Sequence, residues 1–119
     1  MISILLVDDE VQFLEVTRMF LEKGRGIRVT CANSGEQALE LLGNHKFDAI
    51  ISDYAMPGMN GIEFMKQVKA MGDDTPFIIF TGKGRQDVVI DALNFGADLY
   101  LEKSPDPRTQ FSEMMQKVK

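Results

Sequence analysis

The chain has 119 residues, 45% of them hydrophobic, which is enough for one core, and we expect a single domain over residues 1–119. No apolar run approaches the roughly 20 residues that a membrane-spanning helix needs, and no charged and apolar leader opens the sequence, so we expect a cytoplasmic protein without membrane insertion. The net charge of −5 and the lack of a basic patch argue against direct binding of nucleic acid.

Strand and helix patterns alternate five times along the chain. Short apolar and β-branched runs predict strands at Ile2–Val7, Ile27–Ala32, Ala49–Ile51, Phe77–Phe80 and Leu99–Leu101. Helical spacing predicts helices over Val11–Lys23, from the capping-box sequence Ser34–Gln37 to Gly43-Asn44, over Ile62–Met71, over Gln86–Asn94, and along the stripe Phe111, Met114, Met115 and Val118. This alternation predicts an α/β fold with right-handed crossovers and a parallel sheet covered on both faces.

Two of these helices carry more detailed expectations. Met65, Val68 and Met71 share one face of the predicted third helix and should point inward. Gly96 follows the predicted fourth helix and should cap it in the left-handed conformation.

Two of the predicted strands end in acidic residues. Asp8 and Asp9 follow the first strand, and Asp53 follows the third, before the turn signals Pro57-Gly58 and Asn60-Gly61. Because ligands of open parallel sheets bind at the carboxyl ends of the strands, these three carboxylates are expected at one functional edge. Like charges at close range repel one another unless a cation lies among them, and hard oxygen ligands suit Mg²⁺.

Other reactive residues have plainer interpretations. His45 falls in the turn before the third strand, far in sequence from the acids, and is expected to be a solvated loop residue. Asp73 and Asp74 precede a strand, so they belong at the opposite edge of the sheet. Cys31 is the single cysteine and lies in an apolar stretch, where a small buried residue is the expected role.

The acidic pair, Asp53 with the tail Met56–Gly61, Thr81 after the fourth strand and Lys103 after the fifth together resemble the receiver domain of two-component response regulators. These features extend over nearly the whole chain in the right order. The resemblance implies a flavodoxin-like (βα)5 three-layer sandwich whose five parallel strands lie in the order 2-1-3-4-5.

The resemblance also implies a phosphorylation site. Asp53 would be the phospho-acceptor, taking a phosphoryl group from the phosphohistidine of a sensor histidine kinase or phosphotransfer protein. Asp9, Asp53 and the backbone carbonyl of Ala55 would bind Mg²⁺ or Mn²⁺ directly, and Asp8 would hold a metal-bound water. By the same resemblance, the protein is not an enzyme and catalyses only its own phosphorylation and dephosphorylation.

Three further roles come from the resemblance. Lys103 would contact a phosphate oxygen, and Thr81 would donate its hydroxyl once the phosphate is present. Tyr100 would change position together with Thr81, so that the face of helix four, strand five and helix five reports phosphorylation to an unknown downstream effector.

The sequence departs from the family pattern near the site. Family members usually carry proline directly after the lysine, but Ser104 stands there, and Pro105 comes one residue later. A cis bond to a non-proline residue costs about 2.5 to 4 kcal/mol, so the loop that aims Lys103 is expected to differ. Gly82 replaces a frequent alanine, which should leave the phosphate pocket open.

Three alternatives were weighed against this function. A flavin carrier of the same fold would need a phosphate-binding loop after the first strand, where this chain has the anionic Asp8-Asp9-Glu10. A haloacid-dehalogenase-like phosphatase would need Asp-x-Asp there, and Glu10-Val11 follow Asp9 instead. A receiver that binds partners independently of phosphate is the remaining alternative, and the complete acidic set argues against it. Since the sequence stops one helix after the fifth strand, it is expected to be a stand-alone receiver or a piece of a larger regulator.

Overall fold

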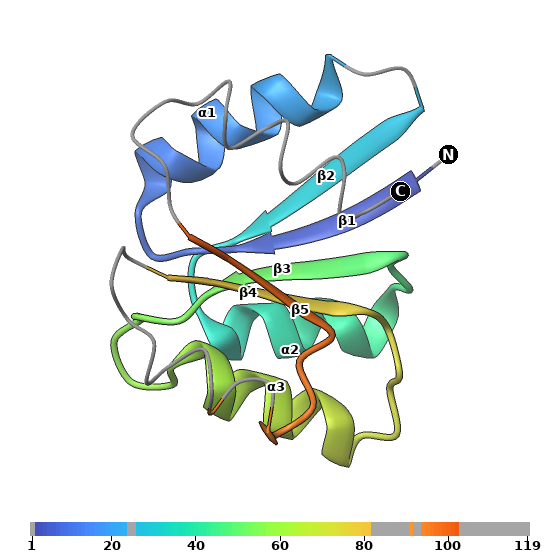
Figure 1. Ribbon diagram of the computed structural model, residues 1–119. Helices are drawn as coiled ribbons and strands as arrows, with labels where there is room; N and C mark the ends of the chain where they lie inside the picture. The colour runs from blue at the N-terminus through green and yellow to red at the C-terminus, as the bar shows by residue number, and fades with distance from the viewer. Residues whose placement is uncertain (1, 24–25, 82–90, 92–93, 103–119) are drawn as a thin grey trace.

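The computed structural model describes residues 2–23, 26–81, 91 and 94–102. Within these residues five parallel strands form one sheet in the order β2-β1-β3-β4-β5, which confirms the predicted flavodoxin-like order (Figure 1). The strands are β1 (Ile2–Val7), β2 (Ile27–Ala32), β3 (Ala49–Asp53), β4 (Phe77–Thr81) and β5 (Leu99–Glu102). The third, fourth and fifth strands run further at their carboxyl ends than predicted, so Asp53 and Thr81 are strand residues.

The sheet separates three described helices into two layers (Figure 1). Helix α1 (Val11–Glu22) covers one face, and α2 (Gly35–Asn44) and α3 (Gly61–Ala70) cover the other. Every residue of β3 and β4 is buried, as expected for central strands of a parallel sheet with helices on both faces. The sheet thus forms the middle layer of a three-layer sandwich.

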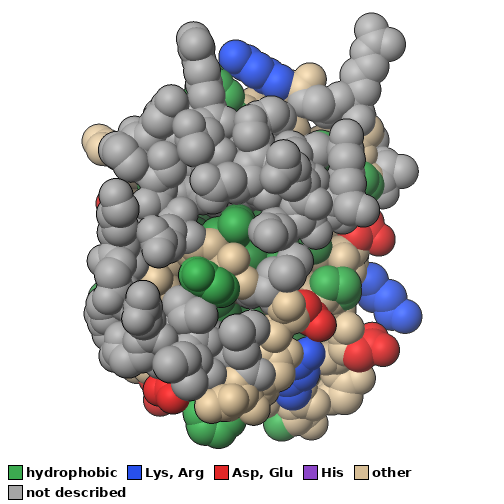
Figure 2. Space-filling model, in the orientation of Figure 1, with side chains coloured by type: hydrophobic (Ala, Val, Ile, Leu, Met, Phe, Trp, Pro, Cys, Tyr) green, Lys and Arg blue, Asp and Glu red, His purple; other side chains and the backbone are tan. Residues whose placement is uncertain are grey.

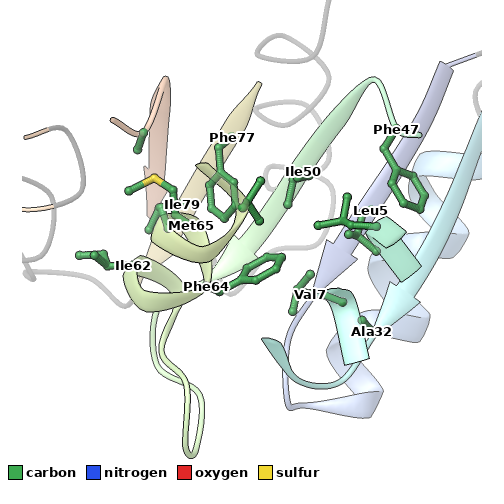
Figure 3. Packing of buried hydrophobic residues seen from close by; sticks show 14 of the residues in the cluster. Leu5, Val7, Ala32, Phe47, Ile50, Ile62, Phe64, Met65, Phe77 and Ile79 are labelled. Carbon is green, nitrogen blue, oxygen red and sulfur yellow. The ribbon is translucent and has the colours of Figure 1, made fainter. Parts of the chain in front are cut away.

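The larger core cluster lies between the sheet and the helices α2 and α3 (Figure 3). Phe64 of α3 and Phe77 of β4 are fully buried, and their ring centroids lie 5.4 Å apart in a tilted arrangement. A smaller cluster on the α1 side includes Leu14, Leu21 and Phe80. Because burial stabilises by roughly 25 cal/mol per Å² of apolar surface, these clusters hold the strands in fixed register beneath the loops.

Two reciprocal contacts join strands at the amino-terminal edge of the sheet. Asp48 donates its backbone N–H to the Ser3 carbonyl (2.7 Å), and its Oδ2 accepts from the Ser3 N–H (2.7 Å). Asp98 makes the same pair with Phe77, at 3.0 Å through the backbone and 2.8 Å through Oδ2. Asp98 therefore satisfies the first N–H of β4, and Asp48 satisfies the N–H of the second residue of β1.

Two helix details differ from the sequence-based prediction. Met71 was predicted to face inward, but it caps α3 one residue past its end and is 51% exposed. The hydroxyl of Ser34 accepts from the Gln37 N–H (3.1 Å) as predicted, whereas Oε1 of Gln37 accepts from the Asn33 N–H (2.7 Å) and not from Ser34. The second bond of the capping box is therefore displaced by one residue.

The end of the predicted fourth helix is partly described. The N–H of Phe95 donates to the Asp91 carbonyl (3.0 Å), and Gly96 has a φ of 110°, which agrees with the predicted left-handed cap. Most of the predicted helix Gln86–Asn94 and the whole stripe from Phe111 to Val118 lie outside the described residues. None of the helices within the described part has the length and apolar character needed to cross a membrane.

Candidate functional site

The acidic residues lie at the carboxyl edge of the two strands in the middle of the sheet. Strands β1 and β3 are parallel neighbours, with Val7 opposite Ser52, so the residues that follow in each strand meet at the same edge. Asp8 is fully buried, Asp53 is 3% exposed, and Asp9 is exposed to solvent. The site therefore has a buried floor of two carboxylates and an open side at Asp9.

The three carboxylates come together in space. One carboxylate oxygen of each of Asp8, Asp9 and Asp53 lies within 4.8 Å of the other two. Hard divalent cations take carboxylate oxygens as ligands, and Mg²⁺ usually binds one or two carboxylates while keeping several waters. The buried carboxylates of Asp8 and Asp53 and the exposed carboxylate of Asp9 fit such a partly hydrated ion.

Asp8 is positioned by the start of the first connection. Its backbone N–H donates to the carbonyl of Ala32, the last residue of β2 (3.1 Å), which extends the β1–β2 pairing by one residue. Its Oδ1 accepts from the Glu10 N–H (2.9 Å), a local turn that leads into α1. The Asp8 backbone is thereby bound to β2, and the Asp8 side chain is bound to the turn that leads into α1.

Asp53 is positioned by a loop that closes on itself. The Tyr54 N–H donates to the Phe80 carbonyl (3.0 Å), and the Gly61 N–H returns to the Tyr54 carbonyl (2.8 Å). Ala55 is an exposed residue of this loop, two residues after Asp53. Because Tyr54 is bonded both to β4 and to Gly61 at the end of the loop, the backbone that follows Asp53 is held in place.

Helix α3 begins with a capping box that we did not predict from the sequence. The side chain of Asn60 accepts from the Glu63 N–H (2.9 Å), and Oε1 of Glu63 accepts from the Asn60 N–H (3.0 Å). The Asn-x-x-Glu spacing before the apolar residues Ile62 and Phe64 was the available signal. It was interpreted only as a turn.

Gly61 allows this helix to begin directly beside the site. A Cβ on Gly61 would clash with the backbone carbonyl oxygen of Asp53 and would lie 3.0 Å from Cα of Tyr54. Only glycine leaves room for so close a backbone approach.

The other candidate residues lie on the strands beyond β3. Thr81 is the last residue of β4 and is 2% exposed; β3 and β4 pair with Asp53 opposite Phe80. Glu102 pairs with Thr81, which brings the carboxyl end of β5 to the same edge. Lys103, the next residue, lies outside the described residues, and so do Gly82 and Ser104.

Tyr100 lies on the edge strand β5, opposite Ile79 of β4, and is 38% exposed. Its neighbour Leu101 is buried in the core cluster on the α1 side. Because side chains alternate along a strand, Tyr100 points to the opposite face of the sheet, on the side of α2 and α3.

His45, Asp73 and Asp74 lie away from this site, as predicted. They line a groove of about 560 Å³ at the opposite edge of the sheet, where the chain enters β3 and β4. His45 is exposed.

Cys31 was expected to be buried, but it is only half-buried. Burial raises the pKa of its thiol. Its Sγ donates to the Leu14 carbonyl at 4.0 Å, a contact between β2 and α1.

Comparison with known proteins agrees with this arrangement. Residues 4–117 match the family described as the response regulator receiver domain. Response regulator SaeR of Staphylococcus aureus is 37% identical over 108 residues, which are 91% of this chain and 46% of the relative. The chain thus spans about half the length of the curated relatives that it matches.

Solved structures show the same similarity over the whole chain. The chemotaxis response regulator CheY4 of Vibrio cholerae superposes with a TM-score of 0.88 at 30% identity, covering 100% of this chain and 99% of that one. The receiver domain of the Francisella response regulator 1452 has a TM-score of 0.86 at 26% identity, covering 99% and 97% of the two chains. With its acidic residues gathered at the carboxyl edge of a sheet in this order, the chain belongs to the response regulator receiver domain family and has its place in two-component phosphorelay signalling.

Proposed function

We propose that Asp53 is the residue of this receiver that accepts the phosphoryl group. The observation that carries the proposal is the approach of the Asp8, Asp9 and Asp53 carboxylates to within 4.8 Å of one another at the carboxyl edge of the sheet. Asp53 is the last residue of the central strand β3, and the loop from Tyr54 to Gly61, closed by the Gly61 N–H on the Tyr54 carbonyl, fixes the backbone beside it.

In this function a carboxylate oxygen of Asp53 attacks the phosphorus of a phosphohistidine on a kinase or phosphotransfer protein. A new oxygen–phosphorus bond forms while the nitrogen–phosphorus bond breaks, and the imidazole keeps the electron pair and takes up a proton. Such a transfer depends mainly on positioning and on neutralising charge on the transferring oxygens. Burial of Asp53 at 3% exposure, on a strand with fixed register, supplies the positioning.

The residues present fit a bound Mg²⁺ or Mn²⁺. Asp9, Asp53 and the Ala55 carbonyl would hold the ion directly, and Asp8 would hold one of its waters. When bound, the ion supplies positive charge next to the transferring phosphoryl oxygens. The exposure of Asp9 leaves an open side through which an ion can enter.

Lys103 and Thr81 complete the proposed site. The ammonium of Lys103 would contact a phosphate oxygen, and its flexible stem compensates for the missing proline at position 104. Thr81 is 2% exposed at the end of β4, and its hydroxyl would donate to the phosphate. We further propose that Thr81 and Tyr100 move together and that the face of helix four, β5 and helix five then binds the downstream effector.

The proposed partners are proteins. Receiver domains of response regulators interact with histidine kinases and with downstream effectors, and we assign both kinds of partner to this chain. On the face shown in Figure 2, the described Lys and Arg side chains lie apart from one another, some beside acidic side chains, which does not favour a nucleic-acid backbone as ligand. The chain would act on its own aspartate only and would not turn over external esters.

The test is incubation with a small-molecule phosphodonor and Mg²⁺, followed by intact mass. Wild type should gain one phosphoryl group, and Asp53→Asn should gain none. Asp9→Asn should bind Mg²⁺ much more weakly, whereas Asp73→Asn, the same change at the opposite edge, should behave as wild type. Modification that persists in Asp53→Asn would disprove the assignment.

A further inference from the structure

The two loops that carry the acidic residues both contact the junction between β2 and α2. On one side, the Asp8 N–H donates to the carbonyl of Ala32, the last residue of β2 (3.1 Å). On the other side, the side chain of Met59, from the loop after Asp53, lies against Gly35, the first residue of α2. The junction therefore contacts both loops of the proposed metal site.

The contact of Met59 with Gly35 leaves no space for a side chain at position 35. A Cβ built on Gly35 would lie 2.7 Å from Sδ, 3.2 Å from Cγ and 3.4 Å from Cβ of Met59. Rotation about χ2 would move Sδ away but leave Cγ too close, since Cγ moves only with χ1. Met59 also packs against the core cluster of α2 and α3, so a rotation of its side chain would disturb that packing.

A second contact joins the same two segments. Gly58 has a φ of 78°, and a Cβ built there would lie 3.7 Å from Oε1 of Glu36, in the first turn of α2. The turn before Met59 therefore also runs beside α2. The far end of the loop is fixed to α3 by the Asn60 capping box.

Ala55 belongs to the same loop, four residues before Met59, and carries the backbone carbonyl assigned to the metal. The loop closes at Tyr54 through the Gly61 N–H (2.8 Å), so a movement at Met59 is passed to a short closed segment. Packed interiors transmit such displacements because they have little free space.

We propose that Met59, seated on Gly35, is a positioning residue for the metal site: it holds the loop of Ala55 at a fixed distance from Asp8. This proposal rests on the proposed function and adds to it a contact outside the set of metal ligands. Loss of partners that orient metal ligands typically weakens metal binding by about 10- to 100-fold. Because Met59 acts through the loop backbone, we expect the lower end of that range.

The experiment measures the Mg²⁺ dissociation constant by titration of the backbone amide signals, together with thermal unfolding. Met59→Ala and Gly35→Ala should each weaken Mg²⁺ binding by about tenfold. The double variant should bind no more weakly than Met59→Ala alone, because a small side chain at position 59 leaves room for the added methyl group.

Two controls separate positioning from general loss of stability. Gly43→Ala is the same substitution on the same helix, where an added Cβ meets nothing within 4 Å, and it should leave the Mg²⁺ constant unchanged. Leu42→Ala removes packing from the same core cluster at a residue that lines the groove at the opposite edge of the sheet, and it should lower the unfolding temperature but not the Mg²⁺ affinity.

The outcomes for the two proposals differ. If wild type binds Mg²⁺ and Met59→Ala and Gly35→Ala bind it as tightly as Gly43→Ala does, the positioning role is wrong and the metal site stands. Equal weakening in Leu42→Ala would also overturn the positioning role, since any loss of packing would then have the same effect. If wild type itself does not bind Mg²⁺, the metal site and with it this inference are both wrong.

Discussion

Replacement of Gly61 by alanine should destabilise the protein, although alanine is the better helix former. Gly61 is the first residue of α3, and its Cα lies directly beside the backbone at the end of β3. An added Cβ would clash with the Asp53 carbonyl oxygen and would lie 3.1 Å from the Asp53 carbonyl carbon. All of these atoms belong to the backbone, so no side-chain rotation can relieve the contact.

The magnitude follows from two opposing contributions. Extra atoms in a packed site cost about 1 to 3 kcal/mol, because the surrounding structure must shift. Exchange of glycine for alanine inside a helix gains up to about 1 kcal/mol, and less at the first helical position of Gly61. The net loss should therefore be about 1 to 2 kcal/mol, which for a domain of this size lowers the unfolding temperature by roughly 4 to 8 °C.

Urea and thermal unfolding of Gly61→Ala measure this loss, and Gly43→Ala is the matched control. At Gly43, inside α2, the added methyl group meets open space, so this variant should be as stable as wild type or gain about 0.5 to 1 kcal/mol. Gly61→Ala should also accept phosphate more slowly on Asp53, since the displaced carbonyl belongs to that residue. Equal stability of the two variants would refute the argument from close approach.

Three further outcomes are expected. Asp98→Ala should lower the free energy of unfolding by about 1 to 3 kcal/mol, because the Phe77 N–H loses its acceptor at 2.8 Å. Asp98→Asn keeps an acceptor oxygen and should lower the free energy of unfolding less, and equal losses in the two variants would contradict this explanation. Burial raises the pKa of the Cys31 thiol above its ordinary value, so alkylation at pH 8 should be slower in folded than in unfolded protein, and equal alkylation rates would refute burial as the cause. Because the raised pKa favours the neutral thiol of the folded state, this contribution to stability should be lost as the pH rises above about 9. Binding of the phosphate mimic beryllofluoride with Mg²⁺ should lower the 38% exposure of Tyr100. A charge-assisted hydrogen bond from Thr81 to the mimic, of about 1.5 to 3 kcal/mol, would shift the population of two side-chain arrangements by tenfold or more, and an unchanged Tyr100 would exclude this residue from the switch.

The strands and the acidic edge were predictable because each depends on local pattern. The apolar run Ile2–Val7 reappears as β1 with the predicted bounds, and Asp8 follows it directly. The placement of Asp53 beside Asp8 required the strand order, which came from the resemblance to receivers and not from periodicity. Once that order is given, the parallel pairing of β1 with β3 brings the two carboxylates to one edge.

The details that failed depend on where a helix ends and on contacts between distant segments. Met71 continues the apolar spacing of α3, but the helix ends at Ala70 and the side chain becomes exposed. Periodicity carries no signal for that end. The local signal is Gly72, which has a φ of 80° two residues after the helix. The closeness of Gly61 to Asp53 and of Gly35 to Met59 was equally invisible, because a glycine in the sequence does not reveal what lies beside it.

The position of the acidic residues suggests how a small group bound there would act on distant parts of the fold. Asp8 opens the connection to α1, and the loop after Asp53 opens the connection to α3 and contacts the start of α2 through Met59. A ligand held between these residues would therefore lie beside the loops that lead into helices on both faces of the sheet. The core beneath is packed on both sides and resists continuous deformation, so charge added at Asp53 is expected to act by shifting loops at the carboxyl edge between discrete arrangements. Thr81 ends the neighbouring strand β4 at this edge, and β4 pairs with β5, which carries the exposed Tyr100.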